Sequence, residues 1–372
     1  MLSYWEKSSF VSYDFIVVGG GIVGFSTALS LKEKHPKASV LVLEAGFLPS
    51  GASTKNAGFA CVGSLSEILE DLKALSPDEV KALVQLRYEG LQLLRARLGD
   101  SNIDYQACTS HELLMEHELH YLDKIVEVNA LLDPIFNSNI FQESRVPLSS
   151  FGFGAQVKSL IQNKVEGSIH TGKMMKRLIL KAQVLGVEYK TSAKVISIED
   201  EGNEVAIEVE NFDEKLKAKK VFICTNAFSK TLLPDLDLNP GRGQVLVTKL
   251  IPDLKFKGIY HFDGGYYYFR EIDGRILFGG GRNIDFETEN TTTLALNEKI
   301  QLDLEAKLRE LIIPNTPFKI DMRWSGIMAF GPNKKILVED ISENVIAGVR
   351  LGGMGVAIGS KLGLMLANKV KY

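Results

Sequence analysis

Residues 14–46 read DFIVVGGGIVGFSTALSLKEKHPKASVLVLEAG and contain a strand, a glycine turn, a helix, a second strand and an acid in that order. The apolar run 15–18 is typical of a buried parallel strand. Apolar residues then recur at near-helical spacing from residue 22 until Pro36 breaks the pattern. This order and spacing predict the strand, turn and helix of a dinucleotide-binding site.

Each glycine of the turn has a separate physical task. Gly19 permits the tight turn, Gly21 lets the backbone approach a pyrophosphate, and Gly24 lets the helix lie close to the strand. We expect the pyrophosphate at the positive end of the helix. Glu44 would accept hydrogen bonds from the adenosine ribose, and its charge disfavours a 2′-phosphate. The stretch alone does not distinguish NAD from FAD.

The composition limits the class of protein. A chain of 372 residues with 45% apolar residues is long enough for two domains. Its net charge of −3 gives no basic field for a nucleic acid. Cys61, Cys108 and Cys224 are few and not in Cys-x-x-Cys spacing, which favours a reducing cytoplasm and no zinc framework. We therefore expect a cytoplasmic protein without nucleic acid partner, transmembrane segment or metal.

A histidine-rich run at residues 111–120 is one residue short of the His-Glu-x-x-His spacing of metalloproteases. We expect an exposed strand and a helix start there.

Strand and helix patterns alternate along the chain and predict a second glycine turn near its end. We expect helices over 65–98, interrupted at Ser76–Pro77, and over 174–186, 297–312 and 356–369; strands over 40–43, 187–189, 221–224 and 344–349; a hairpin over 194–210; and a β-rich segment over 241–283. The turn Gly352-Gly353-Met354-Gly355 lies between the last strand and the last helix. Because such glycine turns occur near both ends of the chain, we expect both ends to contribute to one nucleotide-binding domain.

Several motifs together resemble the FAD-dependent amino-acid and amine oxidoreductases, which include D-amino-acid oxidase, glycine oxidase, sarcosine oxidase and γ-glutamylputrescine oxidase. Residues 51–58, GASTKNAG, resemble the family's Gly-Ala-Ser-x-x-Asn-x-Gly loop, which wraps the pyrophosphate and the flavin. Residues 167–173 resemble the element that leads to a second nucleotide-contact strand, here near Lys194 and Val195. Trp324-Ser-Gly326 and the turn 352–355 resemble the family's segments beside the flavin.

The resemblance implies a fold, a cofactor and its contacts. The fold would be α/β (α+β overall), with a discontinuous Rossmann-like FAD-binding domain at 1–75, 150–235 and 322–372. The inserted substrate domain, at 76–149 and 236–321, would be a mainly antiparallel sheet plus helices. The implied FAD contacts are Gly19, Gly21, Ile22, Val23, Gly24, Glu44, Ala45, Ser53, Thr54, Asn56, Ala57, Gly58, Val195, Thr225, Asn226, Gly326, Gly352, Gly353, Met354 and Gly355.

The sequence departs from the family mainly where substrate would bind. Glycine-oxidase-like members place a carboxylate-clamping arginine two residues after the Trp-x-Gly strand, where this chain has Met328. Asn226 replaces a glycine that is common after the strand at 221–225. Sarcosine oxidase relatives attach the flavin to a cysteine near Trp-x-Gly, but no cysteine lies between 225 and 372 here, so we expect non-covalent FAD.

The hairpin at 266–282 supplies candidate substrate contacts. If Asp273-Gly274 forms its turn, Tyr268 faces Gly279, Tyr266 faces Gly281, and Arg270 shares that face. Tyrosines opposite glycines would leave space for a ligand. A slip of one residue would place Tyr267 and Phe269 there instead, and a solvated or dimer-forming hairpin is the alternative. The substrate-lining candidates are Tyr266, Tyr268, Arg270, Met328 and Arg282; other candidates are Arg323 and Arg350 for an anion, and Lys249, Lys255 or Lys257 for oxygen activation.

The resemblance implies oxidation of a C–N bond in a small amine or amino acid, by hydride transfer to flavin N5 and with O2 or another electron acceptor. No histidine or cysteine catalytic pair is evident, and a neutral amine needs no strong base. The alternatives are an FAD-dependent 2-hydroxy-acid dehydrogenase and a non-catalytic FAD-binding protein. An aromatic-type flavin monooxygenase is disfavoured because Gly-Asp-Ala is missing before the last helix.

Overall fold

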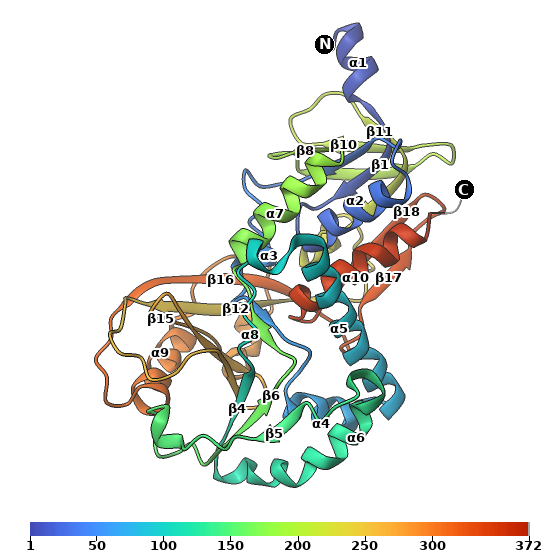
Figure 1. Cartoon of the computed structure of the whole chain (residues 1–372). Helices are drawn as coiled ribbons and strands as arrows, with labels where there is room; N and C mark the ends of the chain where they lie inside the picture. Colours follow the sequence, from blue (N-terminus) through green and yellow to red (C-terminus); the bar gives the residue numbers. More distant parts are fainter. Residues whose placement is uncertain (371–372) are drawn as a thin grey trace.

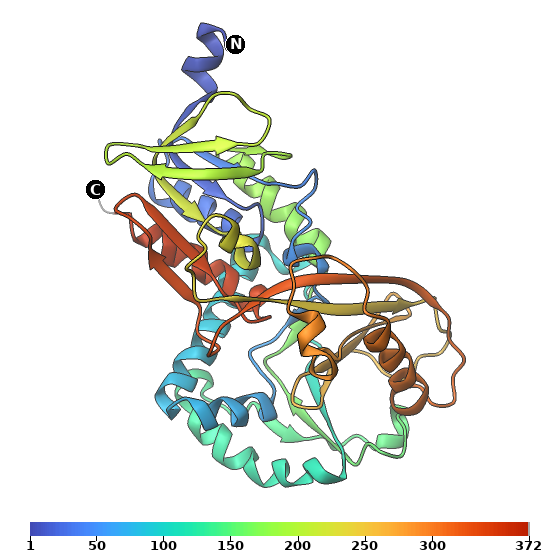
Figure 2. The same cartoon turned by 180° about the vertical axis from the view of Figure 1, so that it is seen from behind.

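Two β-sheets organise the chain, and a computed structural model describes residues 1–370. The first sheet lies in the part of the molecule that carries both ends of the described chain, and the second lies in the other part (Figures 1 and 2). The helix α1 (Tyr4–Phe10) projects from the first part.

The first sheet has the strand order β17-β18-β11-β1-β2-β8. Its strands are β1 (Ser12–Val18), β2 (Val40–Leu43), β8 (Val187–Lys190), β11 (Leu216–Ile223), β17 (Leu337–Asp340) and β18 (Val345–Val349), with the hairpin β9 (Val195–Asp200) and β10 (Val205–Val209) added on β11. β1 is parallel to both β2 and β11. A central parallel strand is covered on both faces, which explains why residues 15–18 are continuously apolar.

Helices from distant parts of the sequence cover this sheet. α2 (Ile22–Lys34), α5 (Pro77–Leu98), α7 (Thr171–Val184) and α10 (Gly355–Asn368) contribute to one hydrophobic cluster with Val17 and Val42. Alternate residues of these strands, such as Ile16 and Val18 of β1, point to the other face of the sheet and belong to a second hydrophobic cluster there. Ser76 begins α5 through a capping box with Glu79, as expected for Ser-Pro at a helix start.

The second sheet has the order β16-β12-β15-β14-β13-β4-β6-β5 and is antiparallel except where β13 meets β4. Its strands are β4 (Ser110–Leu114), β5 (Phe141–Glu143), β6 (Ser159–Asn163), β12 (Asn239–Thr248), β13 (Ile259–Phe262), β14 (Tyr267–Ile272), β15 (Arg275–Gly280) and β16 (Ile320–Phe330). α9 (Glu298–Lys307) and the π-helix at Leu308–Ile312 pack on one face, over an aromatic core that includes Tyr260 and Phe269.

Short elements complete the structure. They are α3 (Ala52–Lys55), α4 (Leu65–Ala74), α6 (Ile125–Phe136), α8 (Phe286–Glu289), the two-stranded pair β3 (Phe59–Ala60) and β7 (Gly167–Ser168), and 3-10 turns at Asp100–Asn102, Glu116–Lys124, Leu148–Ser150, Asn226–Thr231 and Arg282–Ile284. Among the described residues, no helix is both long and apolar enough to cross a membrane.

The sheets do not follow the expected domain boundaries at two places. β6 and most of β16 belong by sequence to the segments expected in the FAD-binding domain, but both strands hydrogen-bond within the second sheet. β16 belongs to both regions, because Ile327 and Ala329 pack in the cluster of the first sheet. The division into domains therefore stays a prediction.

The strand that begins the histidine-rich run is buried, contrary to the expectation of an exposed one. His111 lies inside the second sheet and stacks on Tyr260 with ring centroids 5.1 Å apart. Burial lowers its pKa to about 4.

Candidate active site

The first glycine turn is sterically closed to any side chain. Gly19 has φ of +109°, and a Cβ there would lie 2.8 Å from the carbonyl oxygen of Cys224. A Cβ on Gly24 would lie 1.9 Å from the carbonyl oxygen of Gly19. The start of α2 therefore lies against the end of β1, as the sequence predicts.

The helices α2 and α10 are parallel neighbours. A Cβ on Gly359 would lie 2.4 Å from Ile22 Cγ2, and one on Gly363 would lie 2.6 Å from Ser26. Residue numbers increase in the same direction along both helices at these contacts, so the two helices run parallel. Their amino ends therefore point the same way. Neither N-cap residue, Gly21 nor Met354, caps its helix with a side chain. Two positive helix ends thus face the same region, which favours a ligand with negative charge.

The loop at 51–58 joins α2 to β16. Ser53 Oγ accepts a hydrogen bond from the N–H of Ile22 at 2.9 Å. Trp324 Nε1 donates to the carbonyl oxygen of Lys55 at 2.9 Å, and a Cβ on Gly326 would lie 3.1 Å from Lys55 Cβ. The two motifs expected on either side of a flavin are therefore in contact, which sequence separation alone could not show.

Glu44 directly follows β2 and lies beside the glycine turn. Its carboxylate accepts hydrogen bonds from the N–H groups of Gly20 (2.9 Å) and Gly46 (3.0 Å). Ala193 N donates to the carbonyl oxygen of Glu44 at 2.9 Å, which brings the segment containing Val195 to the same place. Ala45 is exposed beside it.

Tyr189 also belongs to this region, although no sequence motif indicates it. Its hydroxyl is buried without a hydrogen-bond partner, and burial together with the charge of Glu44 raises its pKa to about 12. Its ring would lie 3.3 Å from a Cβ on Gly20. An unpaired donor beside a carboxylate and a glycine cradle fits the adenosine end of FAD. Only its position at the end of a parallel strand could have indicated it.

The second glycine turn lies against β16. Gly352 N donates to the carbonyl oxygen of Ala329 at 3.0 Å, and a Cβ on Gly353 would lie 3.6 Å from Met328 Sδ. Asn226 has φ of +47°, a left-handed conformation that asparagine tolerates better than most residues, which explains how it replaces a glycine. Its Oδ1 accepts the N–H of Arg350 at 3.1 Å, so the segment with Thr225 is tied to the same turn.

The hairpin register is confirmed, with Asp273-Gly274 as its turn and Tyr268 opposite Gly279. The expected space over Gly279 is filled, however, because a Cβ there would lie 2.7 Å from the ring of Tyr268 itself. Tyr266 also lies opposite Gly281 as expected, since the N–H of Gly281 donates to its carbonyl oxygen at 3.0 Å. Its side chain, just before β14, is 46% exposed and packs edge-on against Phe286.

Arg270 holds main-chain groups. Its Nη1 donates to the carbonyl oxygens of Ile169 (2.9 Å) and Gly58 (3.1 Å), and the side chain is buried. It therefore fastens the 51–58 loop to the second sheet. Trp324, Tyr268 and Arg270 thus define the loop-facing side of that sheet.

The other basic candidates are either paired with neighbouring side chains or exposed to solvent. Arg323 bonds Glu305 and Gln301, and Arg350 pairs with Asp237 at 2.9 Å, so both have structural partners. Lys249, Lys255 and Lys257 are exposed on the segment between β12 and β13, and the half-buried lysine beside Trp324 is instead Lys55.

Arg282 has no ion pair among residues 1–370. Its guanidinium lies over the rings of Phe330 (4.3 Å) and Phe286 (5.0 Å), and its buried Nε has no hydrogen-bond partner. A Cβ on Gly241, the residue paired with Met328, would lie 2.8 Å from Arg282 Cζ. Arg282 therefore brings an unpaired positive charge close to Met328.

Comparisons with known proteins agree with this geometry. The family model described as DAO, FAD dependent oxidoreductase, matches residues 14–369. The chain is 25% identical to L-2-hydroxyglutarate dehydrogenase of Escherichia coli over 80% of this chain and 72% of that protein. It is 36% identical to gamma-glutamylputrescine oxidoreductase of Escherichia coli over 25% of this chain and 22% of that protein. The structure of glycine oxidase from Geobacillus kaustophilus superposes with a TM-score of 0.77 at 17% identity, covering 97% of this chain and 96% of that one.

Proposed function

The chain belongs to the DAO family of FAD-dependent oxidoreductases, and we propose that it oxidises a C–N bond of a small amine or amino acid. The observation that carries this proposal is that Met328 lies beside Gly243 and Gly353, with the cation of Arg282 over Gly241. None of these residues offers a side-chain base. A neutral amine can lose hydride without one, whereas a hydroxy acid must also give up its hydroxyl proton.

Bound FAD supplies the hydride acceptor. The amino end of α2 would hold the pyrophosphate, and Glu44 would accept hydrogen bonds from the adenosine ribose. The amino end of α10 would stabilise negative charge that develops on the cofactor. We propose the remaining expected contacts as part of the same FAD site. No cysteine follows residue 224 in the sequence, so none lies near Trp324-Ser-Gly326 along the chain, which supports non-covalent attachment.

Arg282 would bind an anionic group of the substrate in place of the arginine that residue 328 lacks. Its guanidinium is stacked on two rings, so little side-chain entropy is lost when it donates a charge-assisted hydrogen bond to that group. The cofactor would be reoxidised by O2 or another small electron acceptor. The three cysteines are free, which supports a reducing compartment and our proposal of a cytoplasmic location.

Oxidation of a 2-hydroxy acid is the second candidate, favoured by the similarity to L-2-hydroxyglutarate dehydrogenase over 80% of the chain. Arg282 would serve a hydroxy acid equally well, since it recognises the carboxylate. The two candidates therefore differ in the reacting group and in the need for a base.

Anaerobic mixing of the FAD-loaded protein with separate panels of amines, amino acids and 2-hydroxy acids tests the proposal. We expect loss of the oxidised flavin absorption with an amine or amino acid. Bleaching only by hydroxy acids would establish the second candidate. If no compound of the three panels reduces the flavin while dithionite does, the protein is a non-catalytic FAD-binding protein and the proposal is wrong.

A further inference from the structure

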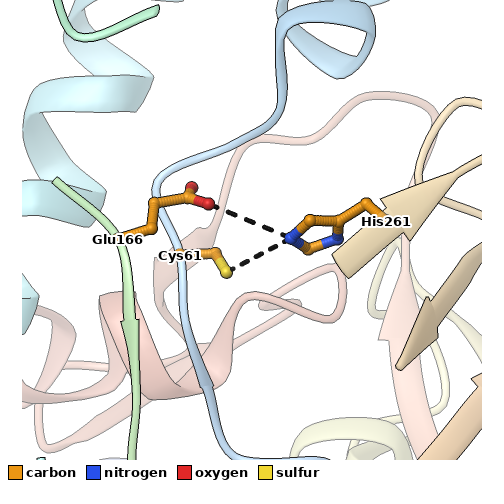
Figure 3. Close-up of side chains that lie close together, drawn as sticks. All are labelled: Cys61, Glu166 and His261. Atoms are coloured by element: carbon orange, nitrogen blue, oxygen red, sulfur yellow. Dashed lines mark hydrogen bonds and ion pairs between the residues drawn. The ribbon is translucent and has the colours of Figure 1, made fainter. Parts of the chain in front are cut away.

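A buried cluster of three different side chains lies outside the proposed FAD and substrate contacts. Cys61 follows β3, Glu166 precedes β7, and His261 belongs to β13 (Figure 3). All three are buried, and their ligand atoms lie within 4.8 Å of one another. Cys61 and His261 are 200 residues apart in the sequence, which explains why no spacing pattern indicated the cluster.

The three side chains converge on one point. Cys61 Sγ lies 3.6 Å from His261 Nε2, and Glu166 Oε2 lies 3.9 Å from the same nitrogen (Figure 3). A proton relay would instead use the two ring nitrogens in series. Convergence of one sulfur, one nitrogen and one oxygen is the arrangement of metal ligands.

The distances suit a tetrahedral ion. Bond lengths of about 2.3 Å to sulfur and about 2.0 Å to nitrogen place the two ligand atoms about 3.5 Å apart. The observed separation of Sγ and Nε2 is 3.6 Å. Bond lengths of about 2.0 Å to nitrogen and about 2.0–2.2 Å to oxygen place those two atoms about 3.3–3.4 Å apart. The glutamate oxygen, at 3.9 Å from Nε2, would therefore approach by about 0.5 Å when the ion binds.

Glu166 is already oriented by outer hydrogen bonds. The N–H groups of Val62 (2.7 Å) and Gly63 (2.9 Å) donate to Oε1, and Ser110 Oγ donates to Oε2. Such bonds fix a ligating carboxylate and leave Oε2 directed at the point of convergence.

The charges also favour a cation. Glu166 is fully buried, and the only ion pair it forms among residues 1–370 is with His261. A divalent ion together with a carboxylate, a thiolate and a neutral imidazole sums to zero charge, the least costly state for a buried site.

We propose that Cys61, Glu166 and His261 bind one divalent transition-metal ion of the zinc class. The fourth position of a tetrahedron would remain for water. The ion would tie the segment that leaves the 51–58 loop to β13 of the second sheet. The ring of Phe59 lies edge-on to His261, at 5.2 Å between centroids, and edge-on to Tyr268, at 5.5 Å. A metal ion on His261 would therefore hold in place the ring against which Phe59 and then Tyr268 pack.

Cobalt(II) provides a direct test on the FAD-loaded protein. After treatment with chelator, the protein is titrated with Co2+, and difference spectra are recorded against the same protein without metal. We expect one equivalent to bind, with thiolate-to-cobalt charge transfer and tetrahedral ligand-field bands at longer wavelength than the oxidised flavin. Zn2+ should displace the cobalt bands.

Matched variants separate this site from other thiols. Cys61→Ser and His261→Gln should each lose the cobalt bands, whereas Cys108→Ser should retain them, because Cys108 contacts Ser168 outside the cluster. Flavin content of each variant reports whether it has folded; if the cluster variants do not fold, the wild-type and Cys108→Ser spectra decide. Absence of the bands from wild-type protein, or their retention in folded Cys61→Ser, would overturn the proposal. Neither result depends on the identity of the substrate.

Discussion

Gly24→Ala tests the contact between α2 and β1 on which the proposed pyrophosphate site depends. The added Cβ would lie 1.9 Å from Gly19 O, and an ordinary contact needs 3.4 Å. The start of α2 must therefore move by about 1.5 Å, which is enough to break hydrogen bonds from its N–H groups to a phosphate. Two charge-assisted hydrogen bonds of about 1.5–3 kcal/mol each would be lost. The Kd for FAD should rise by a factor of about 10² to 10⁴.

The assay is titration of the apoprotein with FAD, followed by quenching of flavin fluorescence. Gly51→Ala is the matched control: a Cβ there meets nothing within 4 Å, so its Kd should equal that of the wild type. An unchanged Kd for folded Gly24→Ala would refute the assignment of the pyrophosphate to this helix end.

Three further predictions concern other parts of the structure. Arg282→Met should weaken binding of a carboxylate that perturbs the flavin spectrum by about 10- to 150-fold, the loss of one charged hydrogen bond; unchanged binding would remove Arg282 from the substrate site. Trp324→Phe should weaken FAD binding about fivefold, because the hydrogen bond to Lys55 O is lost, and the same fluorescence titration would show an unaltered Kd if that bond does not hold the loop. Burial raises the pKa of Glu112 to about 7, so the folded state holds its proton where the unfolded state does not, and stability falls as pH rises from about 4.5 to 7; Glu112→Gln should remove that fall, worth as much as about 3 kcal/mol, and an identical pH dependence of Tm in both proteins would contradict the assignment.

Local patterns in the sequence predict several elements well, because the residues that determine each element lie close together in the sequence. The apolar run 15–18, the capping serine at 76 and the two glycine turns each determine their own conformation within a few residues. The alternation of the hairpin at 266–282 likewise predicted its register.

Contacts between distant segments were not predictable in this way. Arg270 was expected near substrate, yet its guanidinium binds carbonyl groups of the 51–58 loop and of Ile169. Tyr268 fills the space over Gly279 that an alternating pattern leaves open. β16 appeared to belong to one domain because its tryptophan motif does, but it also forms the edge of the second sheet. Each depends on tertiary packing that single-sequence periodicity does not contain.

Oxidation of a C–N bond by FAD in this chain can be followed in the visible spectrum of the purified protein during anaerobic addition of amines and amino acids. We predict one equivalent of tightly held flavin that is released on denaturation and is bleached by at least one such compound. A protein that shows no flavin band even after FAD is added would contradict this function.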